Sequence, residues 1–288
     1  MEWFSHDIPI GLSLFAILFK IVGVILFIPL VPWFTRFLQK LFPEKSTVLG
    51  LSVEHVDPEV PEAALVAIKK DSIKLLKKVF KYIMNVWSVD EQSLLHNHDV
   101  STLLAEQVVF DEQVLDRQYK MIKTIEENLI SFGAHIKRHT HKISYDEEIS
   151  SLYHIVSVSV YAAKYMKDIR ENIVSLEEDD KSWLYNQYQI FRMDLVKLYI
   201  AISEIINGQY SDEIVKEMIT LVGDIKEADN RFLSSLSKDI SKQKLDQYDL
   251  SDVLHINRYV YLSSLSIIEA VKDLLLTPEE KKIFEQLQ

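Results

Sequence analysis

The sequence predicts an all-α protein, with one N-terminal transmembrane helix followed by a bundle of two tandem three-helix units. Three observations predict this fold. The run from Ile8 to Phe34 is apolar and contains a single charge. No proline occurs from Glu62 to Thr277, so no residue of this stretch is barred from a helix interior. Apolar residues recur at helical spacing in six blocks of the same stretch.

Residues 1–45 are expected to form a transmembrane segment and an exit helix at the membrane interface. As a helix, the apolar run would be roughly 40 Å long, against about 30 Å for the hydrocarbon core of a bilayer. Lys20 near its centre costs roughly 2.5–3.5 kcal/mol on insertion, but the many Leu, Ile, Val and Phe side chains of the run offset this cost. Lys20 would then either extend to water or lipid head groups, or contact a partner or a transport path.

Basic residues occur only on one side of the apolar run. Arg36, Lys40 and Lys45 follow it, and no Lys or Arg precedes it. The positive-inside rule therefore places the N-terminus outside and the chain after Phe34 in the cytoplasm. The sequence thus predicts a protein of the inner (plasma) membrane with a single span and a cytoplasmic helical domain. Residues 46–60, with prolines and small residues, are expected to be a linker.

The six apolar blocks lie within residues 61–276 and divide into units of about 61–176 and 179–276. Long amphipathic helices joined by short polar turns must bury their apolar stripes on one another, which predicts an antiparallel bundle. Asn207-Gly208 is a typical C-cap pair and closes the fourth block. Thr277-Pro278 followed by two glutamates starts a short C-terminal helix over residues 277–288.

Composition excludes several functions. The chain carries 32 Lys and Arg against 43 Asp and Glu, and its net charge of −11 argues against binding to nucleic acid. It has no cysteine, so disulfides and thiolate metal sites are excluded. No phosphate-binding glycine loop, nucleophile elbow or zinc-protease motif occurs. We therefore expect a protein that is not an enzyme and that uses no cofactor.

Three stretches carry a resemblance to a known family: "LFKIVGVILFIPLVPWFTRFLQKLFP", "SLYHIVSVSVYAAKYMKDIRENI" and "VLHINRYVYLSSLSIIEAVKDLLL". In their order and pattern, the chain resembles the C-terminal part of bacterial sodium-dependent phosphate cotransporters, from about Leu14 to Leu276. The first stretch looks like the last membrane segment of that family. The other two look like the third helices of the two units of its cytoplasmic PhoU-like domain.

The resemblance implies a role in phosphate transport. It implies a partner, the membrane domain of a phosphate transporter in the same or a split chain, together with membrane lipid; a second copy of the chain is a further candidate partner. The paired Gln-Ser-Ser-Ser repeats of the transporters are absent here, and one span cannot form a two-sided pathway, so the chain alone is not transport-competent. The alternative is a membrane-tethered PhoU-like regulator of phosphate uptake, or a module that senses metal or phosphate.

We expect no metal cluster. PhoU proteins carry Glu-x-x-x-Asp pairs on their third helices, but "KYMKD" keeps only Asp168 and has Lys164 in the other position. If a metal bound, its ligands would come from two pairs at i, i+4 spacing. One pair is Glu112 with Asp116, and the other is His135 with His139. A solvated helix face explains the first pair better, and positions near a helix end explain the second.

Overall fold

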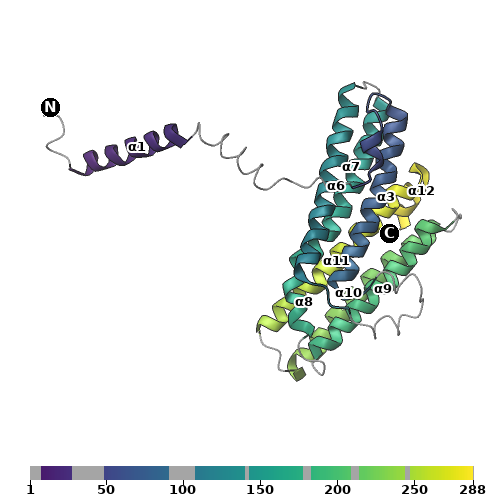
Figure 1. Cartoon of the computed structure of the whole chain (residues 1–288). Coiled ribbons are helices and arrows are strands. Elements are labelled where there is room, and N and C mark those ends of the chain that lie inside the picture. Colours follow the sequence, from purple (N-terminus) through teal and green to yellow (C-terminus); the bar gives the residue numbers. More distant parts are fainter. Residues whose placement is uncertain are drawn as a thin grey trace. The chain divides into compact units, whose positions relative to one another are not determined.

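The computed structural model describes residues 8–27, 49–90, 108–139, 143–177, 183–208, 214–243 and 247–287. The chain divides into two compact units, residues 1–49 and 50–288. The described residues are almost entirely helical and include no strand, which confirms the predicted all-α class. Figure 1 shows the helices coloured along the sequence.

The first unit contains helix α1, Ile8–Phe27. The helix covers 20 residues of the predicted apolar run, and the side chain of Lys20 is exposed. In the part of the chain that the structure describes, no helix meets the length and apolarity needed to cross a membrane. The predicted membrane span is therefore not confirmed.

In the second unit, three long helices form a first three-helix group: α3 (Pro61–Val86), α6 (Glu112–His139) and α7 (Ile143–Asp168). Each of the three packs on the other two. Pro61 stands in the first turn of α3, where a proline costs no hydrogen bond, and Glu62 complements the positive end of the helix. The long apolar stripe of α3 accounts for a large part of the buried core.

The third predicted block does not form one continuous helix. It is divided into α7 and a short helix α8, Arg170–Glu177, by the single non-helical residue Ile169. The side chain of Ile169 is fully buried, and its carbonyl oxygen accepts a hydrogen bond from the Ile173 N–H at 3.0 Å. No proline or glycine occurs at this break, so the sequence does not predict it.

A second three-helix group follows: α9 (Trp183–Asn207), α10 (Ile214–Gln243) and α11 (Gln247–Leu275). The predicted end of the fourth block is confirmed, since α9 ends at Asn207 and the Gly208 N–H bonds to the Glu204 carbonyl oxygen at 2.7 Å. The predicted C-terminal helix is also confirmed as α12, Pro278–Leu287. Thr277 and Glu280 form a reciprocal capping box at its start.

The two groups meet through α7 and α11, the most extensively packed pair of helices in the described structure (Figure 1). Ser263 on α11 and Ala162 on α7, which are small and fully buried, meet at this contact. The Ser263 hydroxyl on α11 donates a hydrogen bond to the Ala162 carbonyl oxygen on α7 at 3.0 Å. The third helix of one group therefore packs directly on the third helix of the other.

A buried arginine also joins the two groups. Arg192 on α9 is fully buried, and its guanidinium reaches the C-terminal end of α3. Its Nε donates to the Trp87 carbonyl oxygen at 2.9 Å, and its Nη2 donates to the Ser88 carbonyl oxygen at 3.2 Å. Ser88 has a φ of 56°, a left-handed conformation that turns the chain at the end of the helix. Arg192 thus stabilises the carbonyl groups that the end of α3 leaves without helical partners.

Part of the predicted linker packs on the bundle. Ser52–His55 form a 3₁₀ helix, η1, which lies against α3, and Leu51 and Val53 are buried. The Val53 N–H bonds to Oδ2 of the buried Asp71 at 2.9 Å. Lys74 contacts Oδ1 of Asp71 at 3.0 Å and donates to the Gly50 carbonyl oxygen at 2.8 Å. Asp71 therefore holds the beginning of the second unit in place.

Candidate functional site

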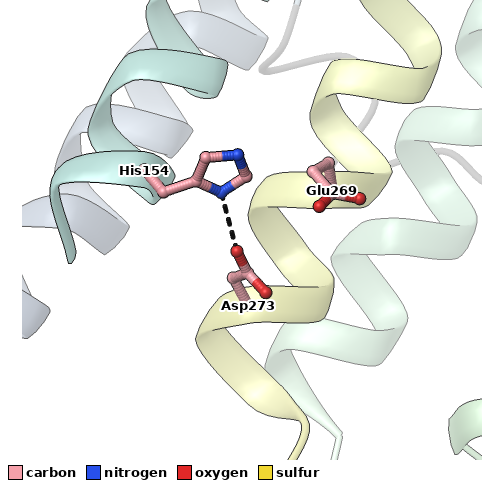
Figure 2. A group of neighbouring side chains, drawn as sticks. All are labelled: His154, Glu269 and Asp273. Atoms are coloured by element: carbon pink, nitrogen blue, oxygen red, sulfur yellow. Dashed lines mark hydrogen bonds and ion pairs between the residues drawn. The ribbon is translucent and has the colours of Figure 1, made fainter. Parts of the chain in front are cut away.

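The described residues bring together one group of side chains with the chemistry of metal ligands: His154, Glu269 and Asp273 (Figure 2). His154 comes from α7, and the two carboxylates lie one turn apart on α11. The imidazole Nδ1 is 2.8 Å from Asp273 Oδ2, and one ligand atom of each residue lies within 4.8 Å of the others. An imidazole and two carboxylates suit zinc and similar divalent ions.

Two lysines already neutralise these carboxylates. Lys272 Nζ lies 2.7 Å from Glu269 Oε1, and Lys281 Nζ on α12 lies 3.0 Å from Asp273 Oδ1. Lys272 is itself buried, so its ammonium needs the carboxylate beside it. A metal ion would have to compete with both ammonium groups. The cluster is therefore best explained as an ion-pair network that ties α7 and α12 to α11.

The predicted acidic pair, Glu112 and Asp116, takes part in ion pairs. Arg170 at the start of α8 pairs with both Glu112 and Asp116, through Nη2 at 2.9 Å and Nη1 at 2.8 Å. Their i, i+4 spacing thus lets both carboxylates pair with the same guanidinium. Asp168 is exposed at the end of α7.

The remaining predicted residues are not brought into a site by the residues that the structure describes. His135 is exposed on α6. His139 is the last residue of that helix, and its side chain lies outside the described residues. Lys20 belongs to the other compact unit of the chain.

Sequence reasoning missed the cluster of His154, Glu269 and Asp273, because His154 lies 119 positions from Asp273 in the sequence. The one local signal is the i, i+4 spacing of the two carboxylates on α11, which is common on solvated helices. Only the pairing of α7 with α11 brings the histidine to them.

Comparison with known proteins adds no assignment. No family description, no curated protein and no solved structure matches this sequence.

Proposed function

We propose that residues 50–288 are a PhoU-like regulatory domain that acts by contact with the membrane domain of a sodium-dependent phosphate transporter. In this proposal the chain is the C-terminal segment of such a transporter, in the same or a split chain, and it is not transport-competent alone. It performs no chemistry and uses no cofactor.

The observation that carries the proposal is the pairing of α7 with α11. These are the third helices of the two three-helix groups, and they contain most of the two stretches that resemble the third helices of PhoU-like units, the first of which continues into α8. The sequence likeness and the spatial arrangement therefore select the same two helices. The ionisable cluster on them is neutralised internally, which favours a structural and binding role over catalysis.

The proposal includes attachment to the inner membrane through the apolar run that contains α1, with the bundle in the cytoplasm. Its basis is the apolar composition of residues 8–34 and the basic residues that follow them. In this arrangement Lys20, whose side chain is exposed along α1, either contacts the transporter or extends to lipid head groups.

The DNA upstream of the Met1 codon provides the first test. We expect paired Gln-Ser-Ser-Ser membrane repeats in the same frame or in the adjacent gene. Expressed together with the full chain, that membrane domain should co-purify with it in near-equal amounts. An upstream region without such repeats, or a membrane domain that elutes separately from the chain, would contradict the transporter assignment and leave a tethered regulator.

The second candidate function is a metal-sensing module, which the cluster of His154, Glu269 and Asp273 favours. Because Lys272 and Lys281 neutralise its carboxylates, we expect the full chain, purified without chelators, to carry far less than one equivalent of zinc, manganese or iron. Elemental analysis checks this. A stoichiometric metal that is lost in His154→Ala would instead support the sensing module.

A further inference from the structure

The second three-helix group has a groove between its helices. Helices α9 and α10 are its most loosely packed pair, and together with α11 they line a cavity of about 610 Å³. A second cavity of about 450 Å³ lies along α9 and α10. Ala201 and Leu221 line both cavities, so the two are parts of one groove. We call it the α9–α10 groove.

The floor of the α9–α10 groove is apolar. Leu221 and Ile225 follow the helical spacing of the apolar stripe of α10, yet both are only half-buried, whereas Met218 and Val222 of the same helix are fully buried. Phe191, Leu195 and Leu198 face the groove from α9. The three α9 side chains are buried already, whereas Leu221 and Ile225 stay partly accessible, so covering these two would be favourable.

Most of the charged residues that line the groove are acidic. Its charged lining residues are five carboxylates against two cations: Asp194, Glu204, Glu217, Asp224 and Asp229, with Lys197 and Arg231. Arg231 also pairs with Glu227, outside the lining, at 3.0 Å. The lining therefore carries an excess of negative charge beside its apolar floor.

Asp194 is a partly buried carboxylate of this lining. Its side chain is 24% exposed, and its Oδ2 lies 4.0 Å from Arg231 Nη2, beyond hydrogen-bond distance. Burial raises the pKa of Asp194 and the nearby Asp224 raises it further, while Arg231 and Lys197 oppose the shift without cancelling it. A cation brought into the groove would stabilise the ionised carboxylate.

The groove is long. Its lining residues extend from residue 187 on α9 to Gly208 just after that helix, and from residue 214 to 235 on α10. At 1.5 Å per residue, this corresponds to roughly 30 Å. An elongated groove with an apolar floor and acidic lining residues is complementary to a helix with one apolar stripe and basic flanks. A compact small molecule would occupy only part of the groove.

We propose that the α9–α10 groove is a docking site for an amphipathic helix of a partner protein, with apolar side chains on the groove floor and Lys or Arg beside Asp194 and Asp224. The helix completes the second three-helix group as a four-helix arrangement. This inference concerns the surface and the chemistry of its ligand, and it holds whether or not the partner belongs to a phosphate transporter.

The test uses the full chain and a synthetic peptide of about 18 residues, with Leu at i, i+3, i+4 and i+7 positions and Lys elsewhere. Binding is followed by fluorescence anisotropy. We expect Asp194→Asn combined with Asp224→Asn to weaken binding at least tenfold. Ala201→Trp, which fills the wall shared by both cavities, should weaken it as much while all charges stay in place.

The matched control removes two exposed carboxylates of α7, as Asp146→Asn with Glu147→Gln. It should change the affinity less than twofold. A peptide with Glu in place of Lys should bind at least tenfold more weakly than the Lys peptide. Circular dichroism of each variant verifies that the bundle is intact.

Three results would overturn the proposal. If the control and the groove variants weaken binding equally, the peptide binds by net charge alone. If the Lys and Glu peptides bind equally, the acidic lining has no role. If 4-phenylbutylammonium binds in an Asp194-dependent manner but the helical peptide does not, the groove is a small-ligand site instead.

Discussion

Arg192→Met is expected to lower the free energy of unfolding by about 3 kcal/mol, because it removes a buried guanidinium on which two helices depend. In the variant the Trp87 carbonyl oxygen loses its donor at 2.9 Å, and Gln189 loses a contact at 3.1 Å. The Ser88 carbonyl oxygen keeps the Val108 N–H at 3.2 Å, which limits the loss. Urea unfolding followed by circular dichroism measures the effect.

Two further variants identify the cause of the loss. Arg117 on α6 is exposed, and its Nε bonds to the Gln113 carbonyl oxygen of its own helix. Arg117→Met should therefore change stability by less than about 0.5 kcal/mol. Arg192→Lys keeps the charge but cannot reach both carbonyl oxygens of α3 at once, so it should fall between wild type and Arg192→Met. A loss below about 1 kcal/mol in Arg192→Met would contradict the anchoring role.

The sequence predicted the all-α class and most of the helix order, because both follow from local rules. The absence of proline from Glu62 to Thr277 and the helical spacing of apolar residues are visible in any short window. The same holds for the end of α9 at Asn207-Gly208 and the start of α12 at Thr277, where single residues supply the cap. The ends of these helices could be predicted because the residues that cap them lie within one helical turn of the end.

The residues that join the two groups were not predictable in this way. Arg192 and Asp71 are charged residues, and solvent exposure is the ordinary expectation for them. Each is buried because a segment distant in sequence supplies its partner: the end of α3 for Arg192 and the 3₁₀ helix η1 for Asp71. The groove was not predictable either. The helical spacing of apolar residues predicts that Leu221 is buried in the core, but in the structure it lines the groove between α9 and α10.

Asp71→Asn is expected to lower the free energy of unfolding at pH 7 by about 2 kcal/mol, the range for buried hydrogen bonds to a charged group. The side chain of Asp71 is fully buried. An asparagine keeps one acceptor for the Val53 N–H, but its amide group then points a donor toward the Lys74 ammonium. Thermal unfolding of the two proteins gives the difference. Asp57→Asn is the matched control, because Asp57 is exposed and its bond to the Glu59 N–H survives the change.

The difference between wild type and Asp71→Asn should depend on pH with a defined sign. Burial alone would raise the pKa of Asp71, but the N–H groups of Ser52 and Val53 and the Lys74 ammonium outweigh it, so the folded pKa lies below the ordinary value. The stabilisation is therefore present above the unfolded pKa of about 3.9 and is lost as the pH falls through the lower folded pKa. Wild type should lose its advantage over Asp71→Asn in acid while keeping it from pH 5 to 7. An advantage of equal size at pH 3 and pH 7 would show that the charge of Asp71 does not hold η1 on α3, and that packing of Leu51 and Val53 does so alone.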